Sequence, residues 1–192
     1  MKYITFIGVD GSGKTYVKDK IIDILRKNKK RVYYEYGGIK EFKFLRFLNP
    51  FVKNKINKKI KQGQSRDTIS YKSKFLKNIS PILYYFEYLF RYINIKLKSN
   101  KYDYVISDRG FIDIVVSPNT NTDIALLLYL LLPKPKQILI YADIETLHKR
   151  RSDHPKQYLE MLDIRYNKYI RHYYTAIKSG KYTVATIMML IQ

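Results

Sequence analysis

Gly8-Val9-Asp10-Gly11-Ser12-Gly13-Lys14-Thr15 is the stretch that decides the fold of this chain, because it fully matches the phosphate-binding loop pattern G-x-x-x-x-G-K-[ST]. Glycines let such a loop aim successive backbone N–H groups at phosphate oxygens, and the helix that follows adds its positive N-terminal end. We expect Lys14 to lie against the β- and γ-phosphates of a nucleotide and Thr15 to offer its hydroxyl to Mg²⁺. The octapeptide therefore predicts a site for ATP and Mg²⁺.

Alternating strand and helix signals extend outward from this loop. Residues 3–9 form a β-branched and aromatic run, and residues 14–28 carry apolar side chains along one helical stripe. Further strands are predicted at 31–36, 102–107, 137–142 and 182–187. Further helices are predicted at 40–48, 68–98, 122–132, 144–152 and 156–178. The alternation indicates an α/β fold of three layers, in which a five-stranded parallel sheet has helices on both faces.

Length and composition limit the class of protein. The 192 residues, 46% of them hydrophobic, suffice for one sizeable core, so we expect a single domain over residues 1–192. The absence of cysteine excludes disulfides, thiolate nucleophiles and cysteine-ligated metals. The N-terminal apolar run is too short for a signal peptide, and the most apolar stretch, 124–132, is far shorter than the about 20 residues that span a bilayer. We therefore expect a cytoplasmic protein without a membrane association.

The charge balance is strongly basic, with 37 Lys and Arg against 16 Asp and Glu and a formal net charge of +21. Such a field raises the local concentration of polyanions, nucleotides and nucleic acids included. An AT-rich coding sequence would produce the same charge, because Lys, Ile, Asn and Tyr are all abundant. The lysine-rich stretch 53–61 is likewise open to two interpretations, a solvated face or an electrostatic contact with phosphate.

Asp108-Arg109 follows the strand predicted at 102–107, at the carboxyl end where ligands bind in open α/β sheets. A carboxylate there can act on Mg²⁺ directly or through its water shell, and the planar fork of Arg109 suits a phosphate. A capping Asp beside a surface Arg would show the same dipeptide.

Together these residues resemble thymidylate kinases and their close relatives among the nucleoside monophosphate kinases, over nearly the whole chain. Tyr34-Glu35-Tyr36-Gly37-Gly38 is similar to the family's R-E-P-G-G with its Arg and Pro replaced. Arg46 follows Gly38 at the spacing at which the family places an Arg for the acceptor phosphate. Residues 141–151 resemble the segment that enters the family's mobile lid. The resemblance implies a P-loop kinase fold with a lid segment near 148–157.

The resemblance also implies a reaction: direct in-line transfer of the γ-phosphoryl group of ATP to a nucleoside monophosphate, dTMP above all, without a covalent intermediate. The phosphate loop carries Gly11 and Ser12 where some members have an Arg, so an Arg of the lid is expected to stabilise the transition state. Catalysis is assigned to Lys14, Asp10, Arg109 and Arg150. ATP binding is assigned to Asp10, Gly11, Ser12, Gly13, Lys14, Thr15, Arg150 and Arg151. Acceptor binding is assigned to Asp10, Arg46, Tyr84, Tyr88, Arg91 and Arg109, and Mg²⁺ binding to Thr15 and Asp108.

Three departures from the family pattern bear on the substrate. Gly110 follows Asp108-Arg109 where the family has an aromatic residue, and the segment 82–91 aligns only after a shift of about one helical turn. The chain also ends soon after the strand predicted at 182–187, where relatives continue into a helix near the adenine, so we expect the base of ATP to be held loosely.

Other classes stay open at this stage. A deoxynucleoside or other small-molecule kinase would use the same donor site but would not need Arg46. A nucleic-acid-binding ATPase or polynucleotide kinase would explain the charge, with tyrosines as stacking platforms, although it is not the favoured interpretation. A non-catalytic nucleotide-binding subunit is disfavoured by the intact Lys14 and Thr15. The resemblance is compatible with a homodimer.

Overall fold

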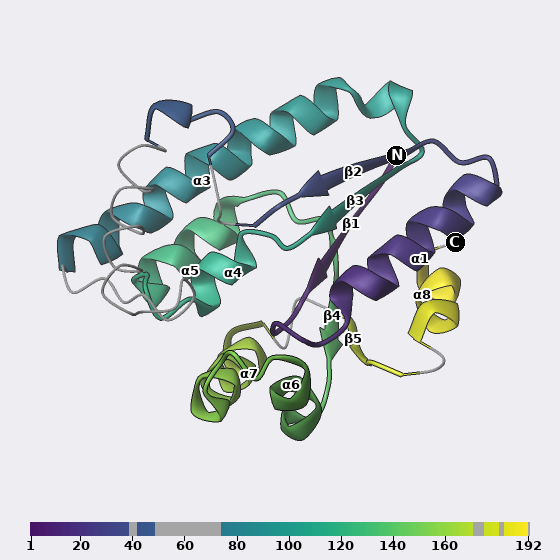
Figure 1. The fold of residues 1–192 in the computed structure, drawn as a ribbon. Coiled ribbons are helices and arrows are strands. Elements are labelled where there is room, and N and C mark those ends of the chain that lie inside the picture. The colour runs from purple at the N-terminus through teal and green to yellow at the C-terminus, as the bar shows by residue number, and fades with distance from the viewer. Residues whose placement is uncertain (39–41, 49–73, 171–174, 181–182, 192) are drawn as a thin grey trace.

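A single sheet of five parallel strands runs through the computed structural model, which describes residues 1–38, 42–48, 74–170, 175–180 and 183–191 (Figure 1). The strands are β1 (Lys2–Ile7), β2 (Val32–Tyr36), β3 (Tyr104–Asp108), β4 (Lys136–Tyr141) and β5 (Thr175–Lys178). Their order in the sheet is β2-β3-β1-β4-β5, which places β1 and its phosphate loop at the centre. The predicted five-stranded parallel sheet is confirmed.

Helices cover both faces of this sheet. They are α1 (Lys14–Lys27), α3 (Lys74–Leu97), α4 (Ile112–Val116), α5 (Thr122–Leu131), α6 (Ile144–Arg150), α7 (Lys156–Ile170) and α8 (Thr183–Ile191), with short 3-10 turns η1 (Arg46–Leu48) and η3 (Ser99–Lys101). Because successive strand side chains point to opposite faces, Ile138 and Ile140 pack with α1 and α8 while Leu139 packs with α4, α5 and α7. Two hydrophobic cores result, one on each face, as the three-layer prediction requires.

The C-terminal elements differ from the prediction. The strand predicted at 182–187 is wrong, because Thr183–Ile191 is helix α8, and the fifth strand is Thr175–Lys178, inside the range predicted as helix. The segment 183–191 is apolar almost throughout, so its period cannot separate a short strand from a buried helix. Ile187 and Ile191 lie one turn apart and pack beside α1. A helix does follow the fifth strand. The expectation of a loosely held ATP base assumed that no helix follows this strand, so the reason for it no longer applies.

The helix predicted at 40–48 is also wrong for most of the described part, since only residues 46–48 form a 3-10 turn. A buried carboxylate from another helix replaces helical hydrogen bonding there: Glu87 of α3 accepts from the backbone N–H groups of Lys43, Phe44 and Leu45 at 2.6, 3.0 and 3.1 Å. The lysine-rich stretch 53–61 lies outside the described residues. The short helix α4 was not predicted.

Among the helices that the structure describes, none has both the length and the apolar character needed to cross a bilayer.

Candidate active site

The phosphate loop connects the central strand β1 to helix α1. Gly8 has a φ of 138°, and a Cβ atom there would stand 2.2 Å from the carbonyl oxygen of Ile140, so only glycine fits between β1 and β4. Gly13 has a φ of 93° and leads directly into α1. The loop therefore has the strand-to-helix setting that phosphate binding requires, with the N-terminus of a 14-residue helix at its end.

Lys14 is buried beneath this loop. Its Nζ donates to the carbonyl oxygens of Gly8 and Val9, both at 2.8 Å, and lies 3.8 Å from Oδ1 of Asp10. Burial and, secondarily, the nearby Arg109 guanidinium lower the pKa of Lys14 to about 8, while Asp10 opposes the shift. A bound triphosphate would supply the negative charge that this site lacks.

Two oxygen groups flank the loop in a way that suits Mg²⁺. The side chain of Asp108 is buried at the end of β3, and its Oδ1 has no hydrogen-bond partner within the described part of the chain. Thr15, in the first turn of α1, is exposed and can turn its hydroxyl toward a ligand. Carboxylate and hydroxyl oxygens are ligands that Mg²⁺ accepts, with phosphate oxygens and water completing its shell. The residues present fit the ion, because the buried Asp108 oxygen that makes no hydrogen bond within the described residues is available as a ligand.

Arg109 occupies a strained position beside the loop. Its φ is 73°, a value uncommon for residues other than glycine, and its backbone N–H donates to the carbonyl oxygen of Phe6 at 2.8 Å. The guanidinium bonds Asp10 through Nη2 and lies 3.7 Å from Asp113 through Nη1. Asp10 is half-buried, and burial would raise its pKa, but Arg109 and Lys14 hold that pKa below its usual range. The left-handed backbone conformation of Arg109 thus accompanies a guanidinium that lies beside the phosphate loop.

Asp113 contacts Arg109, and Tyr166 in turn contacts Asp113. Sequence analysis identified neither of them as a site residue. Asp113 follows Arg109 by four residues, so the spacing of one helical turn was a signal available in the sequence. Its fully buried carboxylate accepts a hydrogen bond from the hydroxyl of Tyr166 on α7, a contact between distant elements that no local pattern reveals. Burial raises the pKa of Asp113, while Arg109 and the Tyr166 hydroxyl oppose that shift.

Arg165 fastens the same helix to α4. Its guanidinium donates to the carbonyl oxygens of Val115, Val116 and Ser117 at 3.3, 2.6 and 3.2 Å and to Oγ1 of Thr122 at 2.7 Å. Three of these acceptors belong to the C-terminal end of α4, where carbonyl groups lack helical partners. Helix α7 is therefore fixed against the element that carries Asp113.

The predicted lid arginines lie over the phosphate loop. Arg150 ends α6 and donates from Nη1 to the carbonyl oxygen of Gly11 at 3.1 Å. Arg151 approaches Gly11 so closely that a Cβ there would be 3.1 Å from its Cγ. The Arg151 guanidinium pairs with Asp153 at 2.8 Å and also contacts Nε2 of the buried His154 at 2.6 Å. Both arginines stand close enough to reach a phosphate on the loop.

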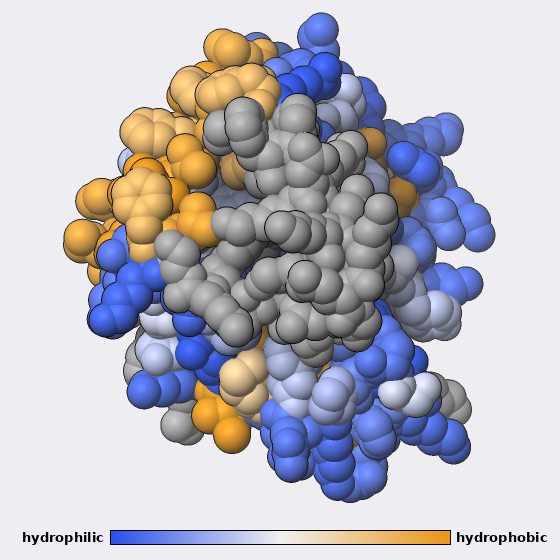
Figure 2. Space-filling view, turned by 60° about the vertical axis from the view of Figure 1, so that its left-hand side comes forward, coloured by the Kyte–Doolittle hydropathy of each residue, from blue (hydrophilic) through white to orange (hydrophobic). Residues whose placement is uncertain are grey.

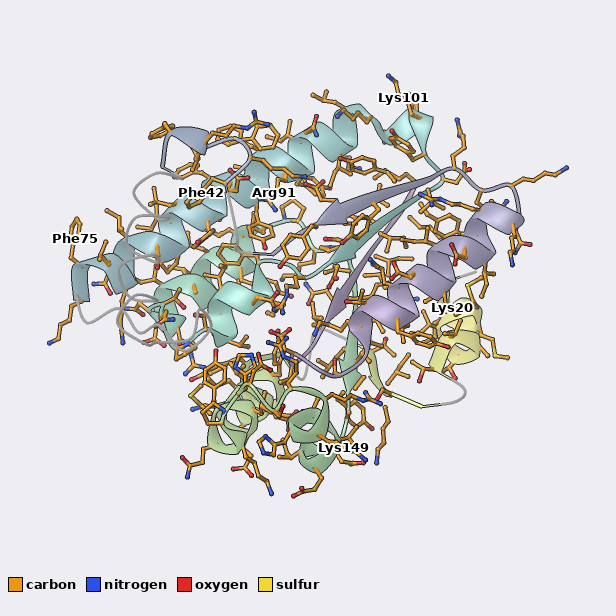
Figure 3. All side chains as sticks on the ribbon, in the orientation of Figure 1. Lys20, Phe42, Phe75, Arg91, Lys101 and Lys149 are labelled. Atoms are coloured by element: carbon orange, nitrogen blue, oxygen red, sulfur yellow. The ribbon has the colours of Figure 1, made fainter. Side chains whose placement is uncertain are left out.

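The residues predicted to hold the acceptor base lie where α3 meets the end of β2. Tyr84 stacks on Phe42 with ring centroids 4.9 Å apart, and the hydroxyl of Tyr88 donates to the carbonyl oxygen of Gly37. Arg91 is buried between α3 and β2 (Figure 3), pairs with Glu87 at 2.8 Å and donates to the carbonyl oxygen of Tyr36 at 3.1 Å. Tyr88 and Arg91 position the end of β2, and their contact with a base stays a prediction.

Arg46 is set apart from the other predicted residues. It is exposed in η1, and its Nε donates to the carbonyl oxygen of Lys43 at 2.9 Å. Glu87, which accepts from the backbone of residues 43–45, couples this turn to Arg91. Through this link the turn that carries Arg46 is attached to the helix of the predicted acceptor residues.

The central strand with its phosphate loop, the strand order and the two helical layers define a P-loop kinase fold. The same fold is found in thymidylate kinase from Ehrlichia chaffeensis, which is 20% identical to the chain; the match covers 100% of this chain and 98% of that one, with a TM-score of 0.57. The thymidylate-kinase-like fold that the motifs predicted is confirmed. No protein-family model matches the sequence, and no curated protein matches it.

Proposed function

We propose that this chain is a phosphotransferase that moves the γ-phosphoryl group of ATP to a nucleoside monophosphate, with dTMP as the first acceptor to test. The observation that carries the proposal is the placement of Arg109. Its guanidinium bonds Asp10 of the phosphate loop, and Arg109 itself follows β3, the strand between β1 and β2 in the sheet. A cation fixed there can hold an acceptor phosphate in line with the triphosphate.

The residues divide the work between donor and acceptor. Lys14 and the backbone N–H groups of the loop would hold the β- and γ-phosphates, and Thr15 and Asp108 would hold Mg²⁺. When bound, the ion supplies neutralisation of the charge that develops on the phosphoryl oxygens. Arg109 would hold the acceptor phosphate, and Asp10 would orient the acceptor through its sugar or a water. Arg150, with Arg151 beside it, would stabilise the transferring group from a lid at 148–157. Residues 1–192 would act as one kinase domain.

A panel of nucleosides and nucleoside monophosphates tests this function. Each compound is incubated with ATP and Mg²⁺, and ADP release is measured together with the phosphorylated product. We expect diphosphate products from one or a few monophosphates, and loss of turnover by orders of magnitude in Lys14→Ala, whose fold is checked by circular dichroism. Phosphorylation of nucleosides alone would show instead a small-molecule kinase, and unchanged turnover in folded Lys14→Ala would exclude a catalytic phosphate loop.

Arg46 separates the two kinds of kinase more finely. Arg46→Ala should weaken binding of the monophosphate far more than binding of the matching nucleoside, because a charge-assisted contact contributes about 1.5–3 kcal/mol. Lys43→Ala in the same turn is the matched control, since it removes an exposed cation that pairs with Glu35. Equal losses for nucleoside and monophosphate would remove Arg46 from the acceptor site.

We also propose that the kinase works as a homodimer. Exposed apolar side chains follow one face of α3 and continue onto its neighbour α5, and Figure 2 shows hydrophobic side chains gathered on part of one face of the molecule. These side chains are Phe75, Ile82, Phe86, Phe90, Ile93, Leu97, Leu127, Leu130 and Leu131. An apolar surface of this extent favours a partner. Light scattering should give the mass of a dimer that Phe86→Glu dissociates; a monomer at every concentration would refute the assembly.

A further inference from the structure

Basic side chains are concentrated at the edge of the sheet opposite the phosphate loop. Because the strands are parallel, the segments that lead into β1, β2, β3 and β4 all lie at this amino edge, and the registers Lys2↔Tyr104, Val32↔Tyr104 and Ile4↔Lys136 place them side by side. We name residues 1–2, 27–31, 96–103 and 134–136 the amino-edge surface. Figure 3 labels Lys101 at this end of the molecule and Lys149, a residue of α6, at the other.

Composition alone does not account for this surface. Ten of its 18 residues are Lys or Arg, whereas the whole chain has 37 in 192, so the basic fraction is about threefold higher. Codon bias would distribute lysine along the chain without regard to which edge of the sheet a segment reaches. Nine of the ten basic residues are exposed, and the surface contains one acidic residue, Asp103. Some of the lysines sit at helix C-termini, where a cation is favourable: Lys2 and Lys136 donate to the carbonyl oxygens of Ile191 and Leu190 in the last turn of α8. This effect does not account for Arg31, which pairs with Asp103.

Backbone contacts hold the surface in a fixed shape. Arg31 pairs with Asp103 at 3.1 Å and donates to the carbonyl oxygen of Asn100 at 3.4 Å, which connects the start of β2 to the segment before β3. The backbone N–H of Lys2 donates to the carbonyl oxygen of Asp103 at 2.8 Å, which adds β1. Lys29 has a φ of 56° and follows the C-terminus of α1, where its backbone N–H and that of Lys30 donate to carbonyl oxygens of the last helical turn at 2.9 and 3.0 Å.

Aromatic rings accompany the charges and indicate which polyanion fits. Tyr33 and Tyr102 lie with ring centroids 5.1 Å apart, at a tilt of 34°, and Tyr102 stands between Lys101 and Asp103 in the chain. Neither ring is fully buried. A positively charged track with a partly exposed aromatic ring is the arrangement by which proteins bind single strands, through phosphate contacts and base stacking.

We propose that the amino-edge surface binds single-stranded nucleic acid, in addition to and separate from the nucleotide site. Strand β1 has six residues at about 3.3 Å each, so the two sites are about 20 Å apart along the sheet. Occupancy of one leaves the other accessible. The surface would keep the enzyme beside the polymer, and it does not depend on which acceptor the kinase phosphorylates.

Fluorescence anisotropy with a labelled single-stranded oligonucleotide tests the proposal, with KCl varied from 50 to 200 mM. The surface variant carries Lys29→Gln, Lys30→Gln, Lys98→Gln and Lys101→Gln. Each phosphate contact on a single strand contributes about −0.7 to the slope of log K against log salt. Removing four lysines should therefore make the slope less negative by about 3. Tyr102→Ala should weaken binding about tenfold, and Tyr102→Phe, which keeps the ring, should bind as the unmodified chain does.

A matched control removes the same charge elsewhere: Lys20→Gln, Lys74→Gln, Lys77→Gln and Lys168→Gln together. It should keep the slope of the unmodified chain. Equal losses in both quadruple variants would show that net charge, not this surface, binds the strand, and would overturn the proposal. Displacement of the oligonucleotide by MgATP would overturn it as well, because binding would then be at the phosphate loop. So would binding to vesicles of anionic phospholipid without binding to the oligonucleotide. ATP turnover measured in parallel shows that the variants are folded.

Discussion

Binding of ATP should carry a proton into the protein, because Lys14 has a pKa of about 8 when no phosphate is present. At pH 8.5 about three quarters of the chains would hold Lys14 in its neutral form, whereas at pH 6.5 nearly all would hold it charged. A triphosphate on the loop returns the pKa toward the ordinary value or above it, so the neutral fraction must take up a proton. We expect an uptake of about 0.75 proton per ATP at pH 8.5 and close to zero at pH 6.5.

The same shift fixes how affinity depends on pH. As pH rises through the pKa of the free protein, the apparent affinity for MgATP should fall about fourfold by pH 8.5 and about thirtyfold by pH 9.5. Isothermal titration in two buffers of different ionisation enthalpy measures the uptake directly. Lys14→Met is the control, since it has a chain of similar length and no proton to accept. Zero uptake at pH 8.5, or equal uptake in Lys14→Met, would refute a buried, partly neutral Lys14.

Three further predictions concern the lid, the acceptor side and stability. The double variant Arg150→Ala and Arg151→Ala should lower kcat about 100-fold or more in single-turnover assays while ATP affinity stays nearly unchanged; full kcat would show that these arginines are surface charge. Tyr166→Phe should raise KM for the acceptor several-fold and leave KM for ATP unchanged, and Tyr169→Phe on the same helix should alter neither; equal changes in both KM values would mean that Tyr166 only stabilises the fold. Glu87→Ala leaves a buried guanidinium and three backbone N–H groups without their carboxylate, so chemical denaturation should show a loss of about 3–5 kcal/mol, and a loss below 1 kcal/mol would contradict that role.

Much of the central region could be predicted from the sequence. The phosphate loop, β1 and α1 agree across motif, periodicity and position, and Asp108-Arg109 stands at a strand end as expected. These features follow from motifs and apolar periodicity within short segments, which can be identified directly in the sequence. The grouping of Lys14, Asp10 and Arg109 then follows from parallel strands that end at one edge.

The remaining features depend on tertiary contacts. Residues 43–45 bond the Glu87 carboxylate instead of forming the helix predicted there, and no periodicity within that segment reveals a partner more than 40 residues away. The element at 183–191 was predicted wrongly because a short segment that is apolar almost throughout is compatible with both the strand and the helix period. Tyr166 was not identified because its hydroxyl bonds Asp113, a residue 53 positions away in the chain, and no local pattern reveals such a contact.

The hydrogen bonds between α7 and α4 limit how the lid proposed at 148–157 could move. With Arg165 holding the end of α4, a hinge in the middle of α7 would have to break several hydrogen bonds at once. The motion that breaks the fewest of these bonds is a rotation of the end of α6 together with the residues up to Pro155, which carries Arg150 and Arg151 with it. A cover this short can exclude water from a phosphate but cannot enclose a whole nucleotide. In the proposed kinase, selectivity for the acceptor would then come from residues of α3 and β2, which this motion does not displace. Exchanging the proposed lid between related kinases should therefore change turnover and leave the choice of base intact.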